Sequence, residues 1–230
     1  MKVLYKSSNI AVLSKPYNTL THVGAGNWDH GLTVAAEAER IFNIPSSEFS
    51  EEEELEDEDS TVYSTPFETS FMKTLTSKTL RRPGIVHRLD SNTTGCIIIA
   101  SNVRTVKYLS EQFKDREIDK LYLARVQGKF EGFVKIEEDL GRDEDDFRRY
   151  KVVGKGEGKE SITILKGLSY DLEIDTSLIA VNILTGRTHQ IRVIASHLGH
   201  PVVGDSKYGG KGERMELHCY EMKFEGEEGR

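Results

Sequence analysis

Runs of apolar residues along the chain predict short buried strands. Ile10–Ser14 is mostly apolar, and Cys96–Ala100 is an unbroken apolar run rich in β-branched isoleucine, so both are expected to be buried strands. Alternation of apolar and polar positions predicts four further strands. These lie at or near Leu121–Gln127, Ser161–Leu165, Leu178–Leu184 and Met215–Cys219.

Three segments carry apolar residues at helical spacing. The first helix is expected within Leu32–Phe42; Ser101 is the expected N-cap of the second, and Thr188 that of the third, which Gly199 follows. Their apolar stripes contain Val103, Val106, Leu109 and Phe113 in the second helix, and Ile191, Ile194 and Leu198 in the third. Strands of uneven spacing with few strand–helix alternations favour an α+β fold with a mixed, largely antiparallel central sheet and flanking helices.

The 230 residues are expected to form a single domain interrupted by an acidic insertion. A hydrophobic fraction of 37% can fill a sizeable core. Glu48–Ser60 holds nine carboxylates and no basic residue, so we expect it to be solvated and disordered. When these nine negative charges are removed from the net charge of −7, the other 217 residues carry +2. Global charge therefore does not exclude RNA as a partner.

The chain is expected to be intracellular and to have no membrane partner. Its longest apolar run, Cys96–Ala100, is far too short to span a membrane. Met1–Ser7 lacks the apolar stretch of a secretory signal, and no arginine precedes Arg40, unlike an Arg-rich presequence. Cys96 and Cys219 are too few for a disulfide framework. Cytoplasm, nucleus and mitochondrion are not distinguished.

One carboxylate stands at the boundary between a buried segment and a polar turn. Asp90 follows the apolar pair Ile85–Val86 and precedes a turn rich in Ser, Asn, Thr and Gly. This placement predicts a carboxylate at the mouth of a sheet, held by backbone and hydroxyl donors and flanked by Arg88. A turn aspartate that bonds only its own loop is the alternative. The segment alone leaves both interpretations open.

A second polar cluster lies on the predicted third helix. His189, Arg192 and Ser196 recur at i, i+3 and i+7, so they share the face opposite the apolar stripe. An arginine at a helix start can bind phosphate or hold a carboxylate. An ordinary solvated helix face is the alternative.

The sequence predicts neither a metal site nor a cofactor site. Two glycine-rich runs, Gly24–Asp29 and Gly154–Ser161, depart from phosphate-binding patterns and are expected to be loops. No acidic ligand stands at a recognised metal-binding spacing from the histidines, and neither cysteine lies in a Cys-x-x-Cys pair. The histidines considered are His189, His197, His200 and His218.

The tetrad His87–Asp90 followed by Thr93-Thr94-Gly95 resembles the signature HRLD-x-x-T-S-G of the RluA-type RNA pseudouridine synthases, with Thr94 where serine is usual. The likeness runs from residue 4 to about 224, apart from the acidic insertion. Further similar runs are Lys15–Pro16, Asp119–Gly128, Thr185–Arg192 (TGRTHQIR), His197–Gly209 (HLGHPVVGDSKYG) and Leu217–His218.

This resemblance implies a pseudouridine synthase fold with a catalytic cleft and an isomerase that converts specific uridines of structured RNA, rRNA or tRNA, to pseudouridine. Asp90 would begin the cleavage of the C1′–N1 bond, by attack on carbon or by removal of the 2′ proton. Tyr122 would stack on uracil, and Arg192 would pair with Asp90. Arg88 would fill the gap left by the flipped uridine. Further RNA contacts are implied for His87, Lys15, Arg187 and His189. No step requires a metal or cofactor.

The family often carries an S4-type RNA-binding domain, for which this sequence leaves no room before Leu4. RNA contacts are therefore expected from the catalytic domain or a partner, and the chain is expected to act as a monomer. One alternative is a non-catalytic RNA-binding or RNA-chaperone protein that retains the cleft. Another is a hydrolase, which would need a second carboxylate at a defined separation from Asp90.

Overall fold

The chain forms one large mixed sheet flanked by helices. A computed structural model describes residues 1–22, 32–44 and 83–226, and within these ranges nine strands pair in the order β1-β2-β3-β9-β4-β8-β7-β5-β6. Every neighbouring pair is antiparallel except β3 and β9. The predicted α+β class with a largely antiparallel sheet is therefore confirmed. The acidic segment and Gly24–Asp29 lie outside the described residues.

The predicted strands and helices are present, several of them longer than expected. The strands are β1 (Lys2–Lys6), β2 (Ile10–Lys15), β3 (Thr94–Ala100), β4 (Asp119–Gln127), β5 (Phe133–Arg142), β6 (Tyr150–Val153), β7 (Lys159–Asp171), β8 (Thr176–Ile183) and β9 (Leu217–Lys223). The helices are α1 (Val34–Phe42), α3 (Val103–Lys114) and α4 (Gln190–His197).

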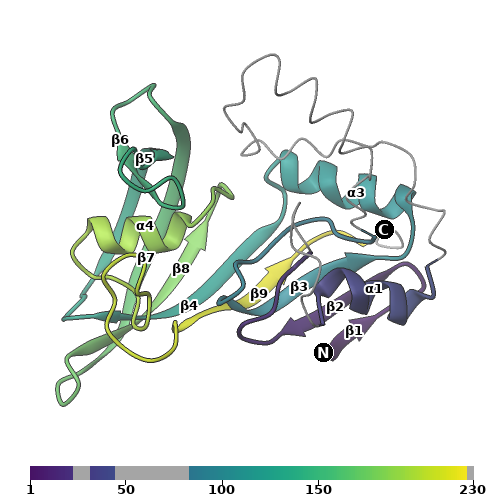
Figure 1. The fold of residues 1–230 in the computed structure, drawn as a ribbon, viewed down its shortest axis with the longest axis horizontal. Coiled ribbons are helices and arrows are strands. Elements are labelled where there is room, and N and C mark those ends of the chain that lie inside the picture. Colours follow the sequence, from purple (N-terminus) through teal and green to yellow (C-terminus); the bar gives the residue numbers. More distant parts are fainter. Residues whose placement is uncertain (23–31, 45–82, 227–230) are drawn as a thin grey trace.

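The sheet has two halves that meet at its centre. β1, β2 and β3 lie with α1 and α3 in one half, while β5 to β8 lie with α4 in the other (Figure 1). β4 and β9 run between them. The pairing of β3 with β9 covers two positions, Thr94 with His218 and Gly95 with Cys219. The functional residues described below converge near this junction.

Apolar burial follows the predicted pattern. Ile97 and Ile99 of β3 and Ile179 of β8 are fully buried, as is Ile194 of α4. α4 is more buried than one apolar stripe requires, because Val193 and several polar residues of this helix are also buried. The α4 helix therefore lies between the core and a polar site.

Both predicted helix caps are displaced by one residue. Asn102, not Ser101, caps α3, and its side-chain oxygen accepts a hydrogen bond from the backbone N–H of Thr105. At α4 the cap position is His189, not Thr188, and it has a left-handed backbone without a side-chain cap hydrogen bond.

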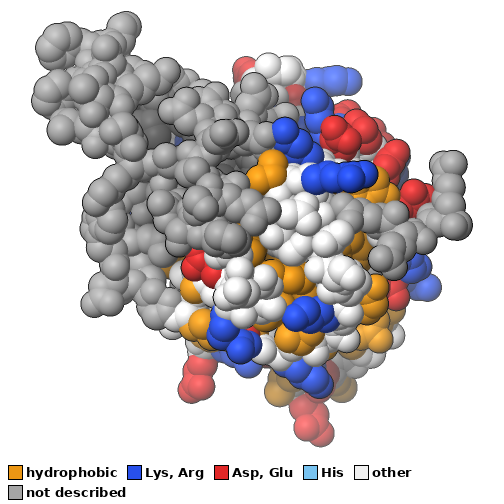
Figure 2. All heavy atoms as spheres, turned by 90° about the vertical axis from the view of Figure 1, so that its right-hand side faces the viewer, with side chains coloured by type: hydrophobic (Ala, Val, Ile, Leu, Met, Phe, Trp, Pro, Cys, Tyr) orange, Lys and Arg blue, Asp and Glu red, His pale blue; other side chains and the backbone are white. Residues whose placement is uncertain are grey.

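The outer strand β1 forms one edge of the sheet. Its apolar side chains Val3, Leu4 and Tyr5 are exposed, between the edge lysines Lys2 and Lys6. The end of the molecule that faces the viewer in Figure 2 shows hydrophobic side chains interspersed with Lys and Arg. Charged residues on an edge discourage pairing with another chain.

No helix among the described residues is long and apolar enough to cross a membrane.

Gly95 is required where the two halves of the sheet meet. Its φ is +112°, and a Cβ at this position would lie 2.1 Å from the carbonyl oxygen of Cys219. We expect Gly95→Ala to cost about 2–3 kcal/mol and to lower the Tm by about 5–10 °C. Gly156→Ala is the matched control, since Gly156 also has positive φ but no atom within 4 Å of the added carbon. Thermal melts in which the two variants are equally stable would contradict this role.

Candidate active site

Asp90 is held by an arginine from the other half of the molecule. The Arg192 Nη1 atom, on α4, donates to Asp90 Oδ2 over 2.7 Å. The Arg192 side chain is 8% exposed and that of Asp90 24%. The predicted pair is therefore present. Two alternative interpretations are wrong: the α4 polar face is not solvated, and Asp90 does more than bond its own loop. Among the described residues the guanidinium of Arg192, and not the expected backbone and hydroxyl donors, donates to the carboxylate.

A second carboxylate, Asp205, binds the same guanidinium. Arg192 Nε donates to Asp205 Oδ2 over 2.6 Å and Nη2 to Asp205 Oδ1 over 2.9 Å. The Asp205 side chain is 2% exposed. Charge-assisted forks of this kind are among the strongest polar contacts in proteins. No local pattern in the sequence indicates a role for Asp205.

His189 lies beside the carboxylate and is fixed by a tyrosine. Its Nε2 is 3.8 Å from Asp90 Oδ2, and its Nδ1 is 2.7 Å from the hydroxyl of Tyr208. The Tyr208 hydroxyl also accepts a hydrogen bond from the backbone N–H of Tyr150 on β6. Burial lowers the pKa of His189 to about 4, although Asp90 acts in the opposite direction. The ring is therefore neutral at physiological pH.

These groups open into a pocket of about 290 Å³. Its wall is mostly polar and comes from five segments of the chain, namely 20–22, 88–92, the start of α4, 204–207 and Met215. The lining includes His22, Arg88, Asp90, Asn92, His189, Arg192, Asp205, Ser206 and Lys207. A small concave site with converging polar groups is suited to hold one polar ring or sugar.

The Asp90 carboxylate is ionised at neutral pH. Burial would raise its pKa, but the charges of Arg192 and Arg88 and the hydrogen bond from Arg192 lower it below the usual value; His189 adds to this lowering only in acid, where its ring is protonated. Arg192 stays charged, because the two carboxylates outweigh the effect of burial and raise its pKa. The pocket thus presents a charged oxygen that can act as a nucleophile or a base.

Lys15 stabilises the loop that carries Asp90 through hydrogen bonds to backbone carbonyl oxygens. Its side chain is fully buried, and its Nζ donates to the carbonyl oxygens of Ser91 over 2.8 Å and Pro16 over 3.2 Å. Burial lowers its pKa to about 8, although Asp90 acts in the opposite direction. Lys15 was expected at the RNA surface, but the structure places it under the loop that carries Asp90.

The buried amine gives a pH dependence of defined sign. The pKa of Lys15 falls from 10.5 to about 8 on folding. Between pH 8 and pH 10.5 the unfolded chain therefore holds the proton and the folded chain does not. The free energy of unfolding consequently rises with pH in this range. We expect the free energy of unfolding of wild type, relative to Lys15→Met, to increase by roughly 3 kcal/mol from pH 7 to 10.5. Urea titrations across this range measure the difference, with Lys166→Met at an exposed site as the control. A constant difference would show that Lys15 is not buried as the structure indicates.

The other predicted RNA contacts lie in different surroundings. Arg88 is exposed at the pocket. The Arg187 Nε donates to the Glu160 carbonyl oxygen over 2.9 Å at the surface. His87 lies apart from the Asp90 group: its Nε2 accepts the backbone N–H of Ile98, and its ring packs on Phe113 with centroids 4.7 Å apart. His87 therefore contributes to the packing of α3 on β3.

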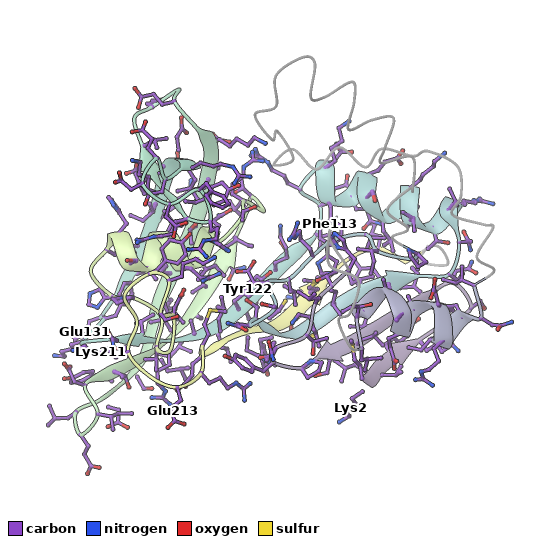
Figure 3. The ribbon with its side chains drawn as sticks, in the orientation of Figure 1. Lys2, Phe113, Tyr122, Glu131, Lys211 and Glu213 are labelled. Atoms are coloured by element: carbon purple, nitrogen blue, oxygen red, sulfur yellow. The ribbon has the colours of Figure 1, made fainter. Side chains whose placement is uncertain are left out.

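Tyr122 lies near the middle of the molecule, on β4 between the two halves (Figure 3). It is buried, and within the described residues the pocket wall does not include it. Burial, its contact with the Cys219 thiol and the charge of Asp90 raise its pKa well above 10. The phenol is thus neutral, and the charge of Asp90 is close enough to affect it.

Sequence reasoning missed the Asp205–Tyr208 end of the site. These residues belong to the run His197–Gly209, which resembles the family but in which no residue was assigned a role. One signal was available, namely an aspartate that follows a glycine in a loop. Gly204 has φ +75°, and a Cβ there would lie 1.8 Å from the Arg214 carbonyl oxygen. Such tight backbone packing holds Asp205 in place.

Comparison with known proteins gives a consistent picture. Residues 9–197 match the family model described as RNA pseudouridylate synthase. The chain is 33% identical over 229 residues to "Ribosomal large subunit pseudouridine synthase D" of Borreliella burgdorferi, covering 97% of this chain and 60% of that protein. It is 32% identical over 212 residues to an "Uncharacterized RNA pseudouridine synthase" of Aquifex aeolicus, covering 92% and 57%.

The fold is also similar to a solved structure, "Human RNA Pseudouridylate Synthase Domain Containing 1". The TM-score is 0.64 at 25% sequence identity, covering 96% of this chain and 76% of that chain. The present chain spans about three fifths of the length of the two curated relatives described above.

Proposed function

The chain belongs to the RNA pseudouridylate synthase family, and from this membership we propose that it isomerises uridine to pseudouridine in RNA, with Asp90 as the catalytic residue. The observation that carries the proposal is the ionised Asp90 carboxylate, bound through one oxygen by Arg192 in a polar pocket. A protein that only bound RNA would gain nothing from a carboxylate facing phosphates. The RNA-chaperone alternative is therefore not favoured.

The reaction is an isomerisation, with no net oxidation, reduction or hydrolysis. The C1′–N1 bond breaks, the detached uracil rotates, and a C1′–C5 bond forms; the proton at C5 is lost, and N1 gains a proton. Asp90 begins this sequence by attack on C1′ or by removal of the 2′ proton, and either role requires the charged form that its lowered pKa provides. Arg192 keeps the carboxylate in place, and His189 offers a neutral ring beside it.

Access to the pocket requires the uridine to leave its stack, which costs a few kcal/mol. Exposed Arg88 lies at the pocket and can stack in the vacated position, because a guanidinium plane both stacks and donates hydrogen bonds. Lys207, also in the pocket wall, has a partly exposed side chain whose Nζ donates to the Arg148 carbonyl oxygen. Together they supply positive charge for the RNA backbone.

Ribosomal RNA is the proposed substrate, since several relatives carry the name ribosomal large subunit pseudouridine synthase. The monomeric state and the intracellular location remain predictions. Mapping of pseudouridines in RNA from cells with and without the gene tests the proposal. We expect one or a few positions in large-subunit rRNA to change to uridine when the gene is deleted. An unchanged rRNA and tRNA map would refute it.

A further inference from the structure

Arg192 divides its three nitrogens between two carboxylates in a fixed way. Asp205 takes Nε and Nη2 as a fork, and Asp90 takes Nη1 alone. All three contacts are between 2.6 and 2.9 Å. The guanidinium is further restricted by the ring of Tyr208, whose centroid is 5.0 Å from its central carbon. Arg192 therefore has a single orientation toward Asp90.

This division determines how Asp90 is held. A guanidinium facing one carboxylate tends to bind both of its oxygens at once. Here the fork is already occupied, so Asp90 is bound through Oδ2, which also faces His189. Within the described residues no donor contacts the other oxygen, Oδ1, and Asp90 lies in the pocket wall. Oδ2 therefore anchors the Asp90 side chain, and Oδ1 remains available to react.

Asp205 is itself held firmly. Its Oδ1 accepts a hydrogen bond from the backbone N–H of Lys207, and its carbonyl oxygen accepts from the N–H groups of Tyr208 and Gly210. The preceding Gly204 packs against the backbone of Arg214. The loop therefore places a buried carboxylate at a fixed position behind Arg192.

We propose that Asp205 is a positioning residue, which keeps Arg192 from binding both oxygens of Asp90 and so leaves Oδ1 as the oxygen that reacts with the ribose. The proposal rests on the proposed function. It predicts that loss of Asp205 slows the chemical step without weakening RNA binding, because Arg192 becomes free to occupy the reacting oxygen.

The first test is Asp205→Asn, which keeps the shape but cannot accept the full fork. We expect kcat for the modification of rRNA, measured under multiple turnover, to fall by about 10- to 100-fold, with KM and the RNA Kd unchanged within about twofold. Asp175→Asn is the matched control: Asp175 accepts a hydrogen bond from Tyr170 in the distant β7–β8 hairpin, and asparagine tolerates its φ of 47°. The control should keep wild-type kcat.

A double variant separates positioning from a merely structural role. If Asp205 acts through Arg192, Asp205→Asn combined with Arg192→Lys should lose far less than the product of the two single losses. The proposal would be overturned if the loss of kcat in the double variant equalled the product of the two single losses. It would also be overturned if Asp205→Asn kept a wild-type kcat, or if its RNA Kd rose while kcat stayed unchanged. Should Asp205→Asn fail to fold, Asp205→Glu retains the charge but displaces the fork, and the same fall in kcat is expected.

A crystal structure of the Asp205→Asn variant gives an answer that needs no turnover. The proposal predicts two Arg192 nitrogens on the two Asp90 oxygens, and an Arg192 unchanged from wild type would overturn it. A wild-type protein inactive on all RNA would refute the proposed function, while this structure would still decide the role of Asp205.

Discussion

An Asp90→Asn variant is expected to lose at least about 10³-fold in the rate of uridine isomerisation, roughly 4 kcal/mol of transition-state stabilisation, while it keeps its fold. Asparagine retains the oxygen that accepts from Arg192 but cannot act as an anionic nucleophile or base. The fold should persist because Arg192 remains paired with Asp205. The carboxylate itself is partly exposed in the pocket, so its replacement leaves no deeply buried group unpaired.

Release of tritium from C5-labelled uridine in rRNA measures the rate, with circular dichroism and an RNA-binding assay as controls. The assignment of Asp90 as the catalytic residue is wrong if the folded variant turns over at a rate near that of wild type.

The second large effect is expected at Arg192. Arg192→Lys keeps the charge but cannot bind two carboxylates with one planar group, so the rate should fall by roughly 10- to 100-fold, or about 1.4–2.8 kcal/mol. The rate of Arg192→Ala should fall further than that of Arg192→Lys. This variant should also lose about 3–5 kcal/mol of stability, because it leaves the buried Asp205 and the adjacent Asp90 without their cation.

Single-turnover kinetics and thermal melts of both variants measure the two effects separately. Arg125→Lys is the matched control, since Arg125 pairs with exposed Glu216 and such surface pairs contribute about 0–1 kcal/mol. Wild-type turnover by folded Arg192→Ala would refute the pairing as a catalytic requirement.

The sequence predicts six of the nine described strands, misses β1, β5 and β6, and does not indicate the order of the strands in the sheet. The apolar run Cys96–Ala100 and the alternation in Leu121–Gln127 correspond to β3 and β4. Neither periodicity nor turn chemistry indicates that β9, the last strand, inserts between them. Strand pairing over some 120 residues depends on the whole core, and a local pattern carries no information about it.

Helix starts were misplaced for a similar reason. Either of two adjacent polar residues, Ser101 or Asn102, can cap a helix, and packing decides between them. At α4 the side chain of Gln190 bonds Thr185 and Thr163, which fixes the start of the helix without a cap from Thr188.

The resemblance named Asp90, Arg192, His189 and Arg88, which all line the pocket, but it assigned no role to Asp205 or Tyr208. Asp90 and Arg192 come together as expected. Lys15 was expected to contact RNA, as the resemblance implied, yet its side chain is fully buried and two carbonyl oxygens accept its hydrogen bonds. Asp205 was missed because only the folded loop brings it behind Arg192. Residues that hold the catalytic groups in place depend on tertiary contacts, which local sequence patterns do not encode.

The most direct measurement is the conversion of uridine in rRNA that lacks the modification. Large-subunit rRNA from cells without the gene is incubated with the purified protein, and pseudouridine is then detected at each position. We expect pseudouridine at the positions that are left as uridine when the gene is deleted, with one tritium released from C5 for each pseudouridine formed. RNA that is bound but keeps its uridine at every position would contradict it.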